Sequence, residues 1–497
     1  MIKTRFAPSP TGVLHLGSVR TALFNWLYAH HKKGICILRI EDTDKERSTE
    51  ENVQAILDGM EWLGIKSDND PIYQSEKLDR YQEIADQWLN SGDAYHCYCS
   101  KDELDDLRKE QMARGEKARY DGRCRDLKKP PRDRDTVIRF KNPLDGEVVV
   151  NDRVHGKVVF QNSELDDLII VRSDGTPTYN FTVVVDDSDM KITHVIRGDD
   201  HLNNTPRQMN MLQVLGVSPP QYAHLPMILG EDGAKLSKRH GAIDIRDYRD
   251  KGYLPEAMLN YLVRLGWSHG NQEIFSLEEM TDFFDLSKLT SSASIFNPGK
   301  LLWLNQHYIM NLPVENIRDA LSISMKKLGI DHSGGPDLIS VVKVFRERAE
   351  TMLHMAESCR YCYEDFKELD PKSVKKHLRP VILEPLKSVS KKFNQLSEWS
   401  SENIESCIKD TVASYDITMG KLGQPLRVAV TGGSVSPPID KTIWLIGKDR
   451  ILRRLEQAIK IIESGTKKLT VGKNFSIGVC PETANPGEIM KDFTNLP

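Results

Sequence analysis

A stretch near the amino terminus, residues 5–17, constrains the fold more than any other part of the chain. It reads R-F-A-P-S-P-T-G-V-L-H-L-G and joins a short apolar segment to a long helical pattern. Two prolines and a glycine cannot continue a strand, so they predict a tight connection. His15 and Gly17 then fall in the first turn of the helix, where unpaired backbone N–H groups and the helix dipole favour a bound anion. We therefore expect an anion-binding turn between a strand and a helix.

The next elements predict a strand–helix–strand unit. Apolar residues recur at three- and four-residue steps through Leu16–His31, which predicts a helix, and Gly34 ends it. The apolar run Ile35–Ile40 predicts a strand buried on both faces of a parallel sheet, at whose carboxyl end a ligand should lie. Three carboxylates follow this end: Glu41, Asp42 and Asp44. These carboxylates suit a ligand site at the strand end, and they equally suit an N-cap cluster before a helix over 49–63. Charge alone does not decide between the two interpretations.

A glycine-bounded basic segment lies far downstream. Residues 230–241 read G-E-D-G-A-K-L-S-K-R-H-G and follow a strand-like run over 222–229. This composition predicts a mobile loop that closes on anions. Alone, the basic run is a weak motif that a solvated turn explains better. Its pairing with residues 5–17 makes it a strong one.

Arg197 lies near the end of another predicted strand, over 193–200, after largely apolar residues. A guanidinium there suits a bidentate pair with a ligand carboxylate, to which Tyr179 could donate through its hydroxyl. An ion pair with Asp199 or Asp200 is the alternative. The apolar run over 176–187 also predicts a buried strand.

The eight cysteines are too sparse in 497 residues for a disulfide framework. Three of them, however, gather with a carboxylate: Cys97, Cys99, Cys124 and Asp126. Three thiolates and one oxygen can close a tetrahedral zinc site. Reduced thiols in a small core are the alternative.

The remaining sequence changes character twice. Short β-rich runs over 135–160, divided by turn dipeptides, predict an antiparallel insert. After residue 243 the pattern is almost wholly helical, with helices expected over 255–265, 277–284, 313–328, 338–356, 380–393, 401–415 and 448–464. Both parts offer basic residues for phosphate contact, although each alone is more simply a solvated charge: Arg139, Lys141, Arg153 and Lys157 in the insert, and Arg346, Arg348, Arg360, Lys375, Lys376 and Arg379 in the helical part. Tyr361 and Tyr363 are candidates for stacking on bases.

Two separated motifs carry a resemblance to a known family. P-S-P-T-G-x-L-H-x-G-S in the first stretch and K-L-S-K-R at 235–239 resemble the paired HIGH and KMSKS motifs of class I aminoacyl-tRNA synthetases. R-F-A-P-S-P-T-G together with I-E-D-T-D at 40–44 is similar to the bacterial glutamyl-tRNA synthetases in particular. Ser18 and Arg239 depart from the class motifs, as is common in the glutamyl branch.

The resemblance implies an α/β fold: a Rossmann-type parallel-sheet catalytic domain with an α+β insertion, followed by an all-α carboxyl-terminal anticodon-binding half. The expected divisions are 1–90, the first half of the catalytic domain; 91–175, the inserted tRNA acceptor-end-binding domain with the zinc site; 176–242, the second catalytic half with the K-L-S-K-R loop; 243–312, a helical stem-contact region; 313–465, the all-helical anticodon-binding region; and 466–497, a carboxyl-terminal extension.

The family activates L-glutamate with ATP and Mg²⁺ and transfers it to tRNA(Glu), so the resemblance implies these partners. It implies catalytic roles for His15, Gly17, Lys235 and Lys238. It implies a glutamate pocket of Arg5, Ala7, Ser9, Glu41, Tyr179 and Arg197, in which two arginines suit a substrate with two carboxylates. It implies ATP contacts from Pro8, Ser9, Pro10, Thr11, Gly12, His15, Gly17, Ser18, Asp200, Lys235, Leu236, Ser237, Lys238 and Arg239. Many bacterial members carry Zn²⁺ at the thiol cluster, with His or Asp as the fourth ligand, which favours Cys97, Cys99, Cys124 and Asp126.

Composition excludes few alternatives. The net charge of −4 does not indicate a nucleic-acid partner, although a local basic face is sufficient for one. No apolar run is long enough to span a bilayer and the amino terminus lacks a signal-peptide core, so we expect a cytoplasmic protein with no membrane partner. We also expect a monomer. A non-discriminating ligase and a catalytically silent tRNA-binding paralogue remain alternatives. The predicted helical carboxyl-terminal half argues against two other relatives. A glutaminyl-tRNA synthetase would have a β-rich anticodon region, and the truncated paralogue of the family lacks the anticodon-binding half altogether.

Overall fold

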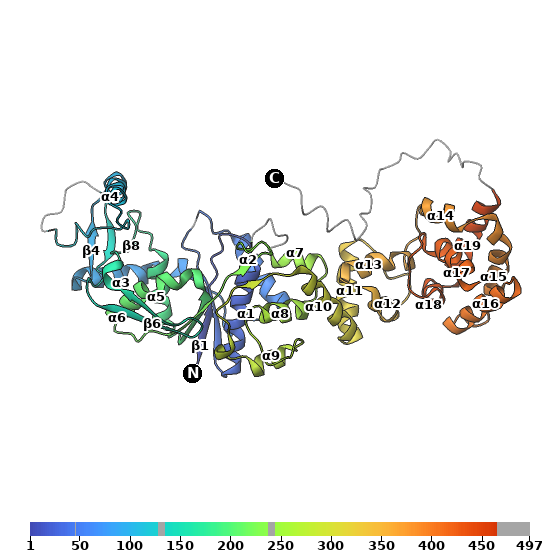
Figure 1. Ribbon diagram of the computed structural model, residues 1–497, viewed down its shortest axis with the longest axis horizontal. Helices are drawn as coiled ribbons and strands as arrows, with labels where there is room; N and C mark the ends of the chain where they lie inside the picture. The colour runs from blue at the N-terminus through green and yellow to red at the C-terminus, as the bar shows by residue number, and fades with distance from the viewer. Residues whose placement is uncertain (45, 128–134, 237–243, 465–497) are drawn as a thin grey trace. The chain divides into compact units, whose positions relative to one another are not determined.

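A computed structural model describes residues 1–44, 46–127, 135–236 and 244–464 of the chain, which divides into two compact units (Figure 1). Unit 1 comprises Met1–Arg249 and Pro255–Leu301, and unit 2 comprises Asp250–Leu254 and the chain from Leu302 onward. Three predicted ATP-binding residues, Ser237, Lys238 and Arg239, lie outside the described residues, as does the extension at 466–497.

Unit 1 alternates strands and helices along the chain. The first elements are β1 (Lys3–Phe6), α1 (Leu16–His31), β2 (Ile35–Ile40), α2 (Glu50–Leu63), β3 (Ile72–Tyr73) and α3 (Leu78–Ser91). The middle elements are β4 (Ala94–Cys97), α4 (Lys101–Ala113), β5 (Val137–Phe140), β6 (Glu147–Asp152), β7 (Gly156–Gln161) and β8 (Ile169–Val171). Then follow α5 (Tyr179–Asp189), β9 (His194–Gly198), α6 (Thr205–Val214), β10 (Gln221–Leu225), β11 (Ile228–Leu229), α7 (Ile245–Asp250), α8 (Pro255–Arg264), α9 (Leu277–Phe283) and β12 (Ser294–Ile295). The last element, α10 (Pro298–Asn311), begins in unit 1 and continues into unit 2.

The predicted strand–helix–strand unit is confirmed. β1 and β2 pair in parallel, with Arg5 opposite Ile37, and α1 packs against both strands. α1 ends at His31 as predicted, and Gly34 follows in the turn to β2, where a Cβ would lie 2.2 Å from the carbonyl oxygen of Ile2. Thr49 caps α2 by accepting a hydrogen bond from Asn52 N at 3.2 Å, so the helix expected over 49–63 is also present.

Two sheets meet edge to edge at the centre of unit 1. One has the strand order β1-β2-β3 and the other β7-β6-β10-β9. Thr193 N, just before β9, donates to Lys3 O of β1 at 3.0 Å, which brings the two edges together. Because β1, β2, β9, β10 and β6 run in parallel within their sheets, several carboxyl ends meet on one side. The α/β fold class is therefore confirmed.

One prediction for unit 1 was wrong. Residues 176–187 form no strand but lead into the helix α5, in which every residue from Phe181 to Asp187 is buried. The β-branched run favours a strand locally, but burial on every side allows the same residues to pack as a core helix. The runs over 135–160 pair antiparallel as predicted, β6 with β7 and β5 with β4 and β8, but they are divided between two sheets, since β6 and β7 lie in the sheet with β9 and β10.

Unit 2 is helical in its described part. After the end of α10 it contains α11 (Val314–Lys327), α12 (Leu338–Phe345), α13 (Met352–Cys359), α14 (Pro371–His377), α15 (Leu383–Gln395), α16 (Ser401–Ser414), α17 (Met419–Thr431), α18 (Ile439–Ile446) and α19 (Lys448–Glu463). The helix expected over 338–356 is instead two helices, because Ala349 is extended and Thr351 begins a new helix by capping His354 N at 3.1 Å. The all-α character expected of this half is confirmed.

Candidate active site

A cavity of about 820 Å³ lies at the carboxyl ends of β1, β2 and β9. Most of the predicted site residues line it: Arg5, Ala7, Pro8, Ser9, Thr11, Gly12, His15, Gly17, Ser18, Glu41, Tyr179, Arg197, Asp200, Lys235 and Leu236. Pro10 is buried and is not among the lining residues. The fold therefore brings together segments that are far apart in the sequence, as the paired motifs predict.

His15 caps the amino terminus of α1. Its Nδ1 accepts a hydrogen bond from Ser18 N at 3.2 Å, and its Nε2 lies 3.0 Å from Ser18 Oγ. Desolvation and then the charge of Lys235 lower the pKa of His15, so the ring is neutral at pH 7 with its proton on Nε2. A Cβ at Gly17 would lie 3.1 Å from His15 Nδ1. Glycine therefore lets the ring fold back over the helix terminus.

Lys235 reaches the same end of the cavity. Its Nζ lies 4.0 Å from Asp200 Oδ2, and both side chains are largely exposed. Exposed pairs at this distance are weak, so the ammonium is available to an anionic ligand. Together with the N–H groups of α1, Lys235 makes this end of the cavity suitable for phosphates.

The other end of the cavity combines two arginines, Arg5 and Arg197, with the carboxylate of Glu41. Arg5 is 4% exposed, Arg197 is 4% exposed and Glu41 is 8% exposed. Tyr179 Oη lies 3.1 Å from His201 Nδ1, and burial raises the pKa of Tyr179 to about 12, which keeps its hydroxyl protonated. This arrangement suits a small ligand that carries carboxylates and an ammonium group.

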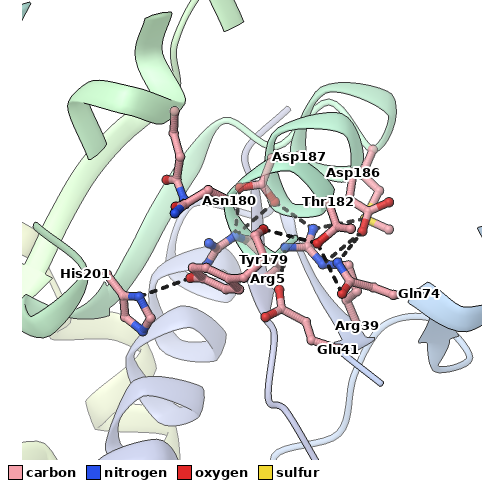
Figure 2. Close-up of polar contacts among 12 residues, drawn as sticks. Arg5, Arg39, Glu41, Gln74, Tyr179, Asn180, Thr182, Asp186, Asp187 and His201 are labelled. Carbon is pink, nitrogen blue, oxygen red and sulfur yellow. Dashed lines mark hydrogen bonds and ion pairs between the residues drawn. The ribbon is translucent and has the colours of Figure 1, made fainter. Parts of the chain in front are cut away.

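A buried charge network lies behind this end of the cavity (Figure 2). Arg39 is fully buried, and its Nη1 lies 2.6 Å from Asp187 Oδ1 while its Nη2 lies 3.1 Å from Glu41 Oε1. Asp187 also accepts from Arg5 Nε, at 3.2 Å. Desolvation raises the pKa of Asp187, but the positive charges of Arg5 and Arg39 outweigh it, so the pKa is lowered overall. Sequence reasoning missed Arg39 and Asp187, although each is a charge within or beside an apolar run.

The pKa of Glu41 shifts in the opposite direction to that of Asp187. Desolvation outweighs the attraction of Arg39 and Arg5, and the pKa of Glu41 is raised. A positively charged ligand group beside Glu41 would favour its ionised form.

Arg197 makes no ion pair with the described residues, so the proposed alternative pairing with Asp199 or Asp200 is absent there. Its Nε donates to His224 Nε2 at 3.1 Å. Its Nη1 is buried without a hydrogen-bond partner in the described part of the chain. A charged donor left unpaired in a cavity wall is suited to a ligand carboxylate.

Three of the four predicted zinc ligands lie together. The sulfur atoms of Cys97, Cys99 and Cys124 are within 4.8 Å of one another, and those of Cys99 and Cys124 are 3.6 Å apart. This spacing fits three thiolates around one tetrahedral zinc ion. The structure places Asp126 apart from this group, since its carboxylate is 88% exposed and lies 3.4 Å from Lys141 Nζ. Tyr120 Oη is nearer, at 3.4 Å from Cys97 Sγ.

Several predicted RNA-contacting residues have partners within the protein. Arg139 is buried, stacks 3.8 Å over the ring of Tyr120 and donates to Asp167 O at 2.8 Å, so it is not on a polar face. Arg346 donates to Ile309 O at 2.7 Å. Tyr363 is buried and donates to Pro336 O at 2.9 Å, which excludes it from stacking on a base. Arg348 is exposed, although it donates to Ser436 O at 2.9 Å. These contacts reduce the number of predicted residues that are suited to contact RNA.

Comparison with known proteins agrees with this geometry. Residues 1–303 match the family described as tRNA synthetases class I (E and Q), catalytic domain, and residues 313–459 match an anticodon binding domain. A curated relative, glutamate–tRNA ligase 1 of Alkalilimnicola ehrlichii, is 58% identical over 463 residues, which cover 93% of this chain and 98% of the relative.

Solved structures give the same result. A glutamate tRNA ligase from Elizabethkingia meningosepticum, in complex with its amino acid, superposes with a TM-score of 0.82 at 32% identity and covers 93% of this chain and 99% of its own. The glutamate-tRNA synthetase of Elizabethkingia anophelis superposes with a TM-score of 0.79 at 33% identity, covering 92% and 99%. Among the described residues, no helix is both long and apolar enough to cross a membrane. The chain belongs to the glutamate–tRNA ligase family of class I aminoacyl-tRNA synthetases.

Proposed function

We propose that this protein activates L-glutamate with ATP and transfers the glutamyl group to the 3′-terminal adenosine of tRNA(Glu), forming AMP and diphosphate. One observation carries the proposal. A single cavity joins a phosphate-binding helix terminus and Lys235 to a pocket with two buried arginines and one buried carboxylate. Glutamate brings two carboxylates and one ammonium group, which match that set of charges.

In the first step, a carboxylate oxygen of glutamate bonds to the α-phosphorus of ATP, and the bond from that phosphorus to the diphosphate oxygen breaks. No protein nucleophile is needed, so catalysis depends on positioning and on stabilising the charge that develops on the phosphate oxygens. We assign that role to His15 Nε2–H, the backbone N–H groups near Gly17, Lys235 and, from the sequence motif, Lys238. Mg²⁺ bound to the phosphates supplies further charge neutralisation.

In the second step, the terminal ribose 2′-hydroxyl attacks the acyl carbon. The ester bond to the ribose forms, the bond to AMP breaks, and the hydroxyl proton is released. The neutral ring of His15 supplies a hydrogen-bond donor without an added charge as the AMP phosphate leaves.

Within the pocket, we assign Arg5 and Arg197 to the glutamate carboxylates and Glu41 to its ammonium group. The hydroxyl of Tyr179 is a further donor. Ala7 and Ser9 complete the wall of the cavity beside the turn.

The finer assignments are supported by the family to which the chain belongs. Segment 91–175 would contact the tRNA acceptor end, and 313–465 the anticodon. Zn²⁺ would be held by Cys97, Cys99 and Cys124 and would tie β4 to the loop that carries Cys124. Its role there is structural, because the cluster is not among the residues that line the cavity.

Glutamate-dependent exchange of labelled diphosphate into ATP, measured with and without tRNA, tests the proposal. We expect exchange that requires glutamate, and we expect Arg5→Gln to abolish it. No exchange by the unaltered protein under any condition would favour the catalytically silent tRNA-binding paralogue. Charging of separated tRNA species then distinguishes a ligase specific for tRNA(Glu) from a non-discriminating one.

A further inference from the structure

The two ends of the Arg197 guanidinium have different surroundings. On one side Nε donates to His224 Nε2 at 3.1 Å, and Nη2 donates to Thr205 Oγ1 at 2.9 Å. On the other side, Nη1 is buried with no hydrogen-bond partner among the described residues. Arg197 also lines the cavity. The protein therefore holds one side of the guanidinium and leaves the other side for a ligand.

His224 is itself held in a single orientation. Its Nδ1 lies 2.6 Å from Asp152 Oδ2, and both side chains are fully buried. Asp152 also accepts N–H bonds from Val154 at 2.9 Å and from His155 at 3.0 Å. Burial raises the pKa of Asp152, but these bonds and the bond from His224 outweigh it, so the carboxyl is ionised and only accepts. The proton of His224 is then on Nδ1, and Nε2 offers its lone pair to Arg197 Nε–H.

The strand register places these groups in a row. β9 and β10 pair in parallel with Arg197 opposite His224, and β10 pairs with β6 through Tyr222 and Asp152. The row therefore crosses three neighbouring strands and ends at the cavity wall.

We propose that His224 and Asp152 are positioning residues for glutamate: they hold Arg197 through a neutral acceptor, so that its guanidinium keeps a fixed orientation and an undiminished charge for a substrate carboxylate. The proposal rests on the proposed function of the cavity. Arg5 is held differently, because its Nε donates to the carboxylate of Asp187 at 3.2 Å, which compensates its charge directly. Arg197 is thus the arginine whose charge is opposed by no adjacent carboxylate among the described residues.

Three variants test this by steady-state kinetics of glutamate activation. His224→Leu removes the acceptor, and His224→Gln keeps an amide oxygen near the position of Nε2. His194→Leu is the matched control, since His194 is a buried histidine at the start of β9 and contacts Tyr28 Oη at 3.3 Å. We expect His224→Leu to raise KM for glutamate about 10- to 100-fold, the range found for groups that orient metal-binding side chains, with KM for ATP changed less than about 2-fold. His224→Gln should recover part of the loss, and His194→Leu should leave both KM values unchanged.

The outcomes separate this proposal from the proposed function. Equal changes in both KM values, or the same glutamate effect in His194→Leu, would show that His224 serves only the fold. No glutamate activation by the unaltered protein would overturn the proposed function itself. Nitrogen-15 NMR of histidine-labelled protein needs no variant: we expect His224 with Nδ1 protonated and Nε2 unprotonated, and the reverse tautomer would overturn the proposal.

Discussion

Replacement of Asp187 by asparagine tests whether the buried charge network sets the glutamate pocket. Asp187 is 7% exposed and its carboxylate joins two arginines, with Oδ1 at 2.6 Å from Arg39 Nη1 and 3.2 Å from Arg5 Nε. Asparagine has nearly the same shape, but it removes the charge and turns an N–H donor toward one guanidinium. Both arginines then lie in a poorly solvated site with one acceptor fewer.

The expected loss of stability follows from these contacts. Removal of one partner of a buried ion pair costs about 3–5 kcal/mol. Arg39 keeps Glu41 at 3.1 Å and Asp186 at 3.6 Å, so we expect a value near the lower end, about 3 kcal/mol. Asp189→Asn on the same helix is the control, because Asp189 pairs with Arg80 at 3.0 Å near the surface. Such a pair contributes less than about 1 kcal/mol.

The sign of the pH dependence is defined by the lowered pKa of Asp187. A carboxyl group with a lower pKa in the folded state stabilises the fold above its unfolded value, about 3.9, and loses that contribution as pH falls through the folded value. The difference between the unaltered protein and Asp187→Asn should therefore be complete at pH 7 and should shrink in acid. Denaturant unfolding at several pH values measures it.

The same variant should impair glutamate binding more than ATP binding. Arg5 loses the acceptor of its Nε, and misplacement of a binding group by about 1 Å can cost up to 100-fold. Diphosphate exchange at varied glutamate and ATP concentrations gives both KM values. If Asp187→Asn unfolds no more easily than Asp189→Asn, or raises KM for ATP as much as KM for glutamate, the network does not act as argued.

Three further outcomes are expected. Burial raises the pKa of Glu41, so KM for glutamate should begin to rise on acidification at a higher pH than the value of about 4.3 for an ordinary glutamate side chain, and Glu41→Gln should flatten that profile. Purified protein should contain zinc by elemental analysis, and Cys99→Ser should lose the zinc. Asp126→Ala should retain the zinc, because the Asp126 carboxylate lies apart from the thiols. Loss of zinc from Asp126→Ala would show that Asp126 is a ligand after all. Lys235→Ala and Lys238→Ala should each lower adenylate formation by orders of magnitude with little change in glutamate affinity, and unchanged turnover in Lys238→Ala would refute its assignment.

The elements whose boundaries are marked by nearby prolines, glycines or apolar spacing were predicted from the sequence. The turn after β1 was predictable because proline and glycine disfavour a strand through their own backbone properties, whatever the rest of the fold. The boundaries of α1 followed from its apolar spacing and the following glycine. In contrast, α5 was predicted as a strand because the valines at 183–185 favour strands. The helix is stabilised by burial of these residues in the folded protein, which the local sequence does not reveal.

The residues that line the cavity were predicted from the sequence, and those behind it were missed. Arg5 and Arg197 interrupt or end apolar runs beside recognised motifs. Arg39 also interrupts an apolar strand, and it lies two residues before Glu41, so both side chains fall on the same face. That pattern was a usable signal for an internal ion pair. His224 offered no such signal, because a lone histidine in a strand has many roles and its partner Asp152 lies far away in sequence.

Asp152 links the segment 91–175 to the sheet that carries Arg197. Composition predicts an antiparallel β-rich insert, and β6 pairs antiparallel with β7. On its other side β6 pairs in parallel with β10, and Val150 packs with Val195 and Tyr222 in one core cluster. A strand that shares a sheet and a core with β9 and β10 cannot shift without disturbing them. Since Asp152 at the end of β6 holds His224, and His224 holds Arg197, the orientation of a predicted glutamate-binding side chain depends on a residue within the segment assigned to tRNA contact. The glutamate pocket and that segment are therefore parts of one structural unit.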